Sequence, residues 1–247
     1  MAQPGCAETN PEISVVIPAH NEEAVIGDCL DELATWMKDS VRRPFEVVVV
    51  DDGSDDLTFE QLMHKKRNLP ELVIVRLEGR HGQTAAFDAG FRSARGDVIV
   101  TMDADMQNHP RDIVALLEQL GRWDVVCGVR QKRNDSFVRR VSSRIANWTR
   151  NKLTGENIRD VGCSLRAFKA ECVKDLKLYD GMHRFLPTLL KLDGWSVTEL
   201  PVTHRPRRRG KAHYGIGNRL FRGLRDIFAV RWMQSRWLKY RIKERIE

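Results

Sequence analysis

The sequence predicts an α/β fold in which helices cover both faces of a mostly parallel sheet. Short apolar runs, mainly of β-branched residues, alternate with stretches of helical periodicity from about residue 13 to residue 128. These runs are apolar throughout, which is typical of strands that are buried on both faces. Three of them end in clusters of polar and acidic residues, as strands do at the ligand-binding edge of an open parallel sheet.

The elements are expected in a regular alternation along the chain. Strands are expected at residues 13–17, 45–50, 72–75, 98–102, 125–128 and 197–202. Helices are expected at about residues 21–33, in the stretch that ends near 68, and at 82–94 and 110–120. Pro18 ends the first strand, and Asn21 to Glu23 are suited to capping the helix that follows. After Arg130 the sequence becomes helix-rich and basic, so one sheet domain with a distinct second half is expected.

Composition excludes several classes of protein. A chain of 247 residues, 42% hydrophobic and 30% charged, can bury a core, which argues against wholesale disorder. Its five cysteines contain no Cys-x-x-Cys pair, which argues against a disulfide framework and a zinc site. The start of the chain has no secretory signal pattern, and no window of about 18 apolar residues predicts a membrane-spanning helix.

Two carboxylates follow the strand expected at residues 98–102. Asp103 and Asp105 are two positions apart, so both can address one hard cation, and Gln107 comes two residues later. Oxygen ligands suit Mg²⁺ or Mn²⁺, which keep room for phosphate oxygens. Asp-x-Asp alone is a weak motif, but its place after a buried strand predicts a metal-diphosphate centre.

The chain resembles the family 2 glycosyltransferases of the GT-A (Rossmann-like) fold, in particular the polyprenyl-phosphate group that includes dolichyl-phosphate mannose synthase. The resemblance runs from about residue 13 to residue 215. Its motifs lie at residues 15–22, 48–54 (Val-Val-Val-Asp-Asp-Gly-Ser), 96–97, 102–107 (Met-Asp-Ala-Asp-Met-Gln), 128–130, 160–168, 184–185 and 207–210. The expected organisation is a flexible leader (1–11), a GT-A domain (12–215) and a basic helical tail (216–247).

The resemblance implies a metal-dependent, inverting transfer of a sugar from a GDP- or UDP-sugar to a polyprenyl (dolichyl or undecaprenyl) phosphate. It implies catalytic roles for Asp105, Arg130 and Asp160, of which Arg130 would bind the acceptor phosphate, and Mg²⁺ or Mn²⁺ ligands at Asp103, Asp105 and Gln107. It implies nucleotide-sugar binding by Pro18, His20, Glu22, Val50, Asp52, Asp103, Ala104, Gln107, Arg207, Arg209 and His213. The family usually has Tyr at position 20, Gly at 164 and Lys at 213. Asp160 would act as a base if the acceptor were a glycan or lipid hydroxyl, and would orient groups if it were a phosphate.

The C-terminal region is strongly basic. Between Arg205 and Arg245 the chain has 14 Lys and Arg against two acidic residues, a net charge of +12, which leaves −5 for the rest. Residues 218–240 have the periodicity of an amphipathic helix with aromatic residues, which favours an anionic membrane surface. Peripheral attachment on the cytoplasmic face of a membrane, or assembly with a separate membrane partner, is expected. A module that only binds anionic surfaces is the non-enzymatic alternative, and no nucleic-acid-binding motif accompanies the charge.

Overall fold

A computed structural model describes residues 10–131, 151–152, 155, 157–206, 217–238 and 243–244. At residues 217–222 and 224 it describes the backbone alone. The strands are β1 (Ile13–Ala19), β2 (Phe45–Asp51), β3 (Leu72–Arg76), β4 (Val98–Thr101), β5 (Val125–Arg130), β6 (Arg166–Lys169) and β7 (Val197–Val202). The helices are α1 (Ile26–Trp36), η1 (Met37–Val41), α2 (Thr58–Lys66), α3 (Gln83–Ser93), α4 (Asp112–Gln119), α6 (Ala170–Lys174), η2 (Met182–Phe185), α7 (Leu186–Leu192) and α8 (Gly217–Arg236).

The strands form one sheet in the order β3-β2-β1-β4-β6-β5-β7. The pairs β1–β2, β1–β4, β2–β3 and β5–β7 are parallel, so the prediction of a mostly parallel sheet is confirmed. β6 runs antiparallel to both of its neighbours, β4 and β5. Strand β6 was not predicted from the sequence, because Arg166 and Lys169 leave only two apolar residues between them, too few to stand out as a strand.

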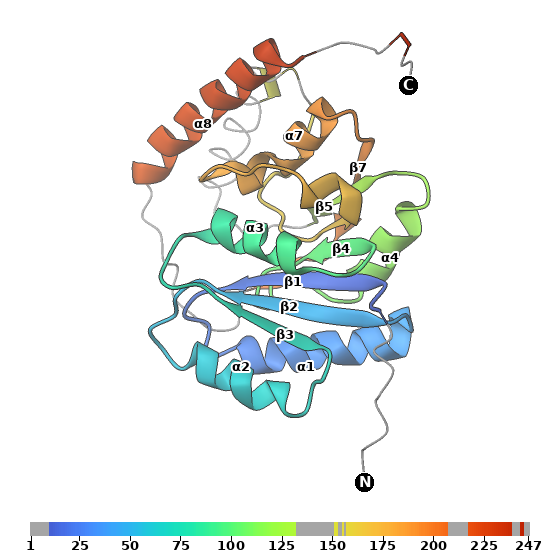
Figure 1. Ribbon diagram of the computed structural model, residues 1–247, viewed down its shortest axis with the longest axis vertical. Coiled ribbons are helices and arrows are strands. Elements are labelled where there is room, and N and C mark those ends of the chain that lie inside the picture. The colour runs from blue at the N-terminus through green and yellow to red at the C-terminus, as the bar shows by residue number, and fades with distance from the viewer. Residues whose placement is uncertain are drawn as a thin grey trace.

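Helices cover both faces of the sheet, as predicted. Figure 1 shows α1 and α2 on one side of the sheet and α3 on the other. The core beneath α1, α2 and α4 takes up Val15 and Ile17 of β1, whereas the core beneath α3, α6 and α7 takes up Val16. Because neighbouring residues of β1 point to opposite cores, the strand has to be apolar along its whole length.

Helix α3 packs very closely on β1 and β2. A Cβ atom at Gly90 would overlap the Val16 side chain and would lie 3.3 Å from Cγ2 of Val50, so only glycine permits this approach. Beside it, the rings of Phe87 and Phe91 stack with their centroids 5.9 Å apart. This packing fixes the N-terminal end of α3 next to the loops that follow β2 and β4.

The expected capping of the first helix is wrong. Helix α1 begins at Ile26, and Val25 before it makes no capping hydrogen bond through its side chain. Asn21, with φ of 56°, instead donates from its backbone N–H to Oγ of Ser54 (3.0 Å) and from its side chain to Asp55. The polar residues after β1 therefore bind the loop after β2, which brings these two strand ends together.

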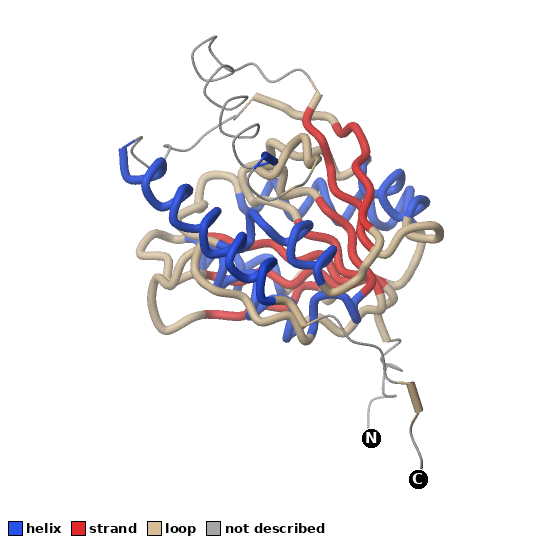
Figure 2. The backbone as a smooth tube through the Cα atoms, turned by 90° about the horizontal axis from the view of Figure 1, so that it is seen from above, coloured by secondary structure: helices blue, strands red, loops and turns tan. Residues whose placement is uncertain are grey.

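Helix α8 docks on the side of the molecule formed by η2 and α7. Ile227 and Val230 pack against an apolar cluster that includes Phe185, and Oδ2 of Asp226 accepts a hydrogen bond from Arg184 (2.9 Å). Figure 1 shows α8 at the edge of the molecule, and Figure 2 shows it as one long helix. Across the residues that the structure describes, no helix combines the length and the apolar character that crossing a membrane requires.

Candidate active site

The polar residues predicted as a site gather at one edge of the sheet. Pro18, near the end of β1, lies in register with Val50 near the end of β2. Asp103 follows β4, and Arg130 ends β5, which runs in the same direction because both strands are antiparallel to β6. The antiparallel β6 begins where its neighbours end, so the loop that leads into it, residues 160–165, reaches the same edge.

The loop after β4 holds the two predicted metal ligands. Asp105 is buried, whereas Asp103 is half-buried and accepts a hydrogen bond from Nε2 of Gln83 (3.0 Å). The backbone N–H of Gln107 donates to Oδ1 of Asp105 (3.1 Å). Met106, between them, has φ of 61°, in the left-handed region that a residue with a side chain rarely adopts.

The two carboxylates repel one another. Burial, and next the charge of Asp105, raise the pKa of Asp103 to about 6, while the neighbouring Ser164 hydroxyl and the charges of Arg130 and Arg166 act in the opposite direction. A cation at this position would favour the ionised form of both carboxylates. The donor set is oxygen, which fits Mg²⁺ or Mn²⁺. No group of three His, Cys, Asp or Glu side chains in the described part of the chain is arranged to hold a metal; an ion held by two carboxylates keeps positions for phosphate oxygens and water.

The predicted nucleotide-binding residues are partly engaged with one another. Nδ1 of His20 donates to the carbonyl oxygen of Asp52 (2.9 Å). The two carboxylate oxygens of Asp52 accept hydrogen bonds from the backbone N–H groups of His81 (2.6 Å) and Gly82 (2.8 Å). Asp52 therefore holds the turn that begins α3.

The other predicted nucleotide-binding residues differ in exposure. Pro18 in β1 and Glu22 in the segment after β1 are half-buried. Ala104, which lies between Asp103 and Asp105 in the sequence, is buried. Val50 is fully buried and its side chain packs in the core beneath α3. The side chain of Val50 therefore faces the protein interior.

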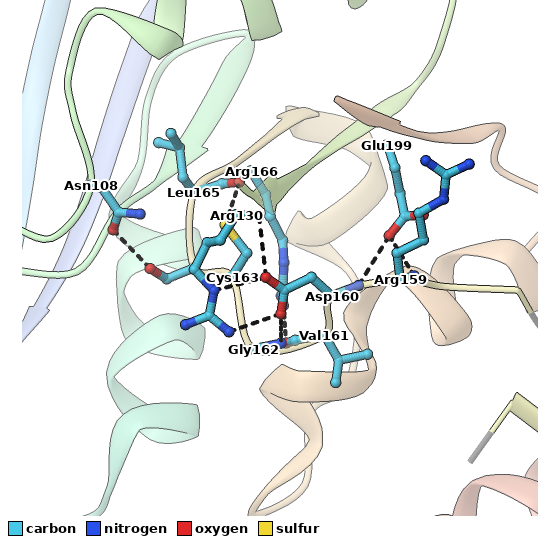
Figure 3. Close-up of polar contacts among 11 residues, drawn as sticks. Asn108, Arg130, Arg159, Asp160, Val161, Gly162, Cys163, Leu165, Arg166 and Glu199 are labelled. Atoms are coloured by element: carbon cyan, nitrogen blue, oxygen red, sulfur yellow. Dashed lines mark hydrogen bonds and ion pairs between the residues drawn. The ribbon is translucent and has the colours of Figure 1, made fainter. Parts of the chain in front are cut away.

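Arg130 and Asp160 form an ion pair with two parallel hydrogen bonds. Nε of Arg130 lies 2.7 Å from Oδ2 of Asp160, and Nη2 lies 2.8 Å from Oδ1. Figure 3 shows the guanidinium facing the carboxylate, with Glu199 beyond Asp160. The N–H of Gly162 also donates to Oδ1 (3.1 Å), and a Cβ at Gly162 would lie 2.7 Å from Nη2 of Arg130. The sequence predicted these two residues separately; the structure makes them one unit.

Ser164 and Arg166 also lie near the site, although the sequence predicted a functional role for neither of them. Oγ of Ser164 donates to Oδ1 of Asn108 (3.0 Å), which also accepts the N–H of Asp103 (3.3 Å). Arg166 is buried, with 4% of its surface exposed, and its two Nη atoms donate to the carbonyl oxygens of Val161 and His183. Both residues lie within the stretch 160–168 that carries the resemblance, but a buried arginine and a surface arginine look alike in a sequence.

Gln107 contacts the segment that follows β7. Its Nε2 donates to the carbonyl oxygen of Arg205 (3.4 Å), and the N–H of Arg205 donates to its carbonyl oxygen (2.9 Å). The guanidinium of Arg205 pairs with the carboxylate of Glu32 on α1. The predicted site residues Arg207, Arg209 and His213 lie outside the described residues.

Comparisons with known proteins agree with the geometry. Residues 14–177 match the family model described as glycosyl transferase family 2. The chain is 38% identical to dodecaprenyl-phosphate galacturonate synthase of Rhizobium johnstonii, over 89% of this chain and 66% of the relative. It is 36% identical to undecaprenyl-phosphate 4-deoxy-4-formamido-L-arabinose transferase of Edwardsiella ictaluri, over 83% of this chain and 63% of the relative. The chain thus spans slightly less than two thirds of the length of these relatives.

Solved structures with low sequence identity share the fold. One is glucosyl-3-phosphoglycerate synthase from Mycobacterium tuberculosis in complex with Mn²⁺, UDP-glucose and phosphoglyceric acid, with a TM-score of 0.67 and 20% identity over 96% of this chain and 87% of that chain. The same synthase in complex with Mg²⁺ and UDP gives a TM-score of 0.67 and 19% identity, over 95% of this chain and 85% of that one. The predicted GT-A fold is confirmed.

Proposed function

Because the chain belongs to glycosyl transferase family 2, we propose that it transfers a sugar from a nucleoside-diphosphate-sugar to a polyprenyl phosphate. One observation carries the proposal: a carboxylate pair after β4 and an arginine at the end of β5 lie at the same edge of the sheet. The first suits a metal-bound diphosphate and the second suits a phosphate. The two curated relatives, whose names specify dodecaprenyl and undecaprenyl phosphate, support the choice of acceptor.

The donor half is assigned to the loops after β1, β2 and β4. Asp103, Asp105 and Gln107 would hold Mg²⁺ or Mn²⁺, which supplies positive charge against the departing diphosphate. Pro18, His20, Glu22, Asp52 and Ala104 would surround the nucleotide, and Arg207, Arg209 and His213 would join the diphosphate. Val50, whose side chain is buried in the core, would contribute its backbone. UDP is the proposed nucleotide, because the similar solved structures contain UDP or UDP-glucose.

The proposed reaction is one displacement that inverts the anomeric carbon. An oxygen of the acceptor phosphate forms a new bond to the anomeric carbon, while the bond between that carbon and the diphosphate oxygen breaks. A phosphate is already ionised at neutral pH and needs no base. The contacts of Asp160 with Arg130 and Gly162 favour an orienting role for this carboxylate, with Arg130 as the residue that binds the acceptor phosphate.

A panel of donors and acceptors tests this function. UDP- and GDP-sugars are supplied with undecaprenyl phosphate, and release of the nucleoside diphosphate and formation of the glycolipid are measured. Transfer to the lipid phosphate supports the proposal, and consumption of GDP-sugars alone would contradict the choice of UDP. Transfer only to a glycan or lipid hydroxyl would favour the second enzymatic function, in which Asp160 is a base. No turnover with any donor would leave the anionic-surface module.

The metal centre is tested with Asp105→Ala. We expect this variant to lose transfer while retaining its fold, because Asp105 is proposed to hold the cation. Asp39→Ala is the matched control, since Asp39 is exposed on η1. Transfer that persists both in Asp105→Ala and in the parent with chelator would rule out the metal centre.

The proposed acceptor is a membrane lipid, and α8 presents a surface suited to a membrane. Phe228 and Trp232, one helical turn apart, are 63% and 65% exposed, and Arg225, Arg231 and Arg236 are exposed near them. Aromatic and basic side chains together favour an interface with anionic lipids. We therefore propose peripheral attachment to a membrane through α8.

Sedimentation with vesicles tests the attachment. The double variant Phe228→Ala/Trp232→Ala should bind vesicles that contain anionic lipid more weakly than the parent. Trp123→Ala, which removes an exposed tryptophan before β5, should bind like the parent. Equal binding by all three proteins would contradict the role of α8, and binding that requires a separate membrane protein would favour assembly with that partner.

A further inference from the structure

We infer that Glu32 and Arg205 form a positioning pair that fixes the turn carrying Asp105. The inference rests on the proposed function, because it gives two residues a role at the same donor site. Glu32 belongs to α1, Arg205 follows β7, and Asp105 follows β4, so the pair joins segments that are far apart in the sequence.

The turn that carries Asp105 requires support from outside. Met106 has φ of 61° although it has a long side chain, a conformation that costs free energy and persists only where neighbouring contacts enforce it. Met106 is buried, so water does not stabilise the turn. Within the turn, the N–H of Gln107 donates to Asp105, which ties the direction of the carboxylate to the backbone at Gln107.

Arg205 supplies the support. Its N–H donates to the carbonyl oxygen of Gln107 (2.9 Å), and its own carbonyl oxygen accepts from Nε2 of Gln107 (3.4 Å). Next to these contacts, Asn108 and His204 form an antiparallel bridge. The segment after β7 therefore holds the chain immediately after Met106 at two successive residues.

Glu32 in turn fixes Arg205. Nη2 of Arg205 lies 2.6 Å from Oε1 of Glu32 and Nη1 lies 3.0 Å from Oε2, a paired geometry that defines the position of both groups. The two side chains are only 16% and 26% exposed, so solvent competes little with the pair. The contacts thus run without interruption from α1 through Arg205 and Gln107 to Asp105.

A buried thiol on α1, Cys29, lies in the same neighbourhood. Burial raises the pKa of Cys29 to about 12, and the charges of Asp105 and Glu32 follow as further causes. Arg205 acts on the same thiol in the opposite direction. All three charged groups therefore lie around Cys29, on the inner side of α1.

Calorimetry of nucleotide binding tests the inference without a measurement of activity. UDP and GDP are titrated into the full chain with and without Mn²⁺. For the Glu32→Gln variant we expect the gain in affinity that Mn²⁺ provides to fall about tenfold or more, as for other residues that orient metal ligands. Affinity in the absence of metal should not change, because Glu32 is proposed to act through Arg205 and is not assigned to the nucleotide. Melting of each variant is measured first to verify folding.

Two further variants separate positioning from general stability. Glu12→Gln breaks the exposed Arg43–Glu12 pair and should leave the effect of Mn²⁺ intact. Met106→Gly relieves the left-handed backbone strain. Glu32→Gln should therefore reduce the gain in nucleotide affinity from Mn²⁺ less in the Met106→Gly variant than in the parent.

The outcomes are distinguishable. A parent with a clear Mn²⁺ effect and a Glu32→Gln variant with the same effect would overturn the inference while leaving the proposed donor site in place. Equal losses in Glu32→Gln and Glu12→Gln would also overturn it, because removal of any surface charge would then suffice. A parent with no Mn²⁺ effect on either nucleotide would refute the proposed donor site and this inference together.

Discussion

The Asp160→Asn variant tests whether Asp160 acts on Arg130 or on the substrate. The carboxylate accepts hydrogen bonds from Nε and Nη2 of Arg130 and from the N–H of Gly162. Asparagine has the same shape but lacks the charge, and its amide nitrogen cannot accept a hydrogen bond. The variant therefore leaves the guanidinium of Arg130 beside a neutral group.

The structure sets the size of the expected effect. The side chains of Arg130 and Asp160 are 15% and 6% exposed, so this is a mostly buried ion pair. Removing one member of such a pair costs about 3–5 kcal/mol, and the remaining exposure of Arg130 favours the lower value, about 3 kcal/mol. In a chain of this length, such a loss lowers the melting temperature by about 6–12 °C.

A double-mutant cycle measures the effect. Denaturant unfolding and thermal melting are compared for the parent, Asp160→Leu, Arg130→Met and the double variant Arg130→Met/Asp160→Leu, and Asp160→Asn is measured beside them. The double variant should regain much of the loss, because an apolar pair leaves no buried charge unpaired. An Asp160→Asn variant that melts with the parent but transfers no sugar would refute the reasoning, since Asp160 would then act on the substrate.

Three further predictions concern stability. Gly90→Ala should lower the free energy of unfolding by about 1–3 kcal/mol, because its Cβ would overlap the β1 side chain beneath it. Thermal melting compares this variant with Gly223→Ala, whose Cβ meets no atom within 4 Å. Equal melting temperatures of the two variants would refute the packing argument. Burial, with the charges of Arg184 and Arg166, lowers the pKa of His183 to about 3 from an ordinary 6.5, so the unfolded chain takes up a proton that the folded chain does not. Stability should therefore fall as the pH drops from about 6.5 towards 3, and denaturant titrations should show a shallower fall in His183→Gln; identical slopes would contradict this. The hydrogen bond from Lys169, followed by those from Ser196, lowers the pKa of Asp124 to about 2 from an ordinary 3.8, so its stabilising effect should be complete above pH 3.8 and lost towards pH 2. Lys169→Met should reduce that acid loss in melting curves, and an unchanged acid limb would count against the pairing.

Most of the sheet could be predicted from the sequence because its strands carry their own signal. β2 has four consecutive valines and β7 coincides with the expected residues 197–202. β6 lacks such a signal, because its four residues become a strand only through pairing with β4 on one side and β5 on the other. The cap expected at Asn21 failed for a related reason. Asp55 of another loop engages the Asn21 side chain, and Oγ of Ser54 accepts its backbone N–H.

The candidate site could be predicted as a set of residues but not as a set of contacts. Asp103 and Asp105 stand out because they follow a buried strand in a short spacing. The pairing of Arg130 with Asp160 joins residues 30 positions apart, and the motif at residues 160–168 does not reveal which side chain Asp160 contacts. The Glu32–Arg205 contact spans 173 positions, so only the folded chain reveals it.

The antiparallel strand β6 determines how far apart the two halves of the site lie. Arg166 pairs with Thr101 of β4 and with Cys127 of β5, so a single row of the sheet relates Asp103 to Arg130. A slip of β6 by one residue would send Arg166 and Phe168 to the wrong face, and a slip by two would displace one half against the other by about 7 Å. In the proposed reaction, the distance between the metal-binding and phosphate-binding groups is therefore set by the hydrogen-bond register of β6.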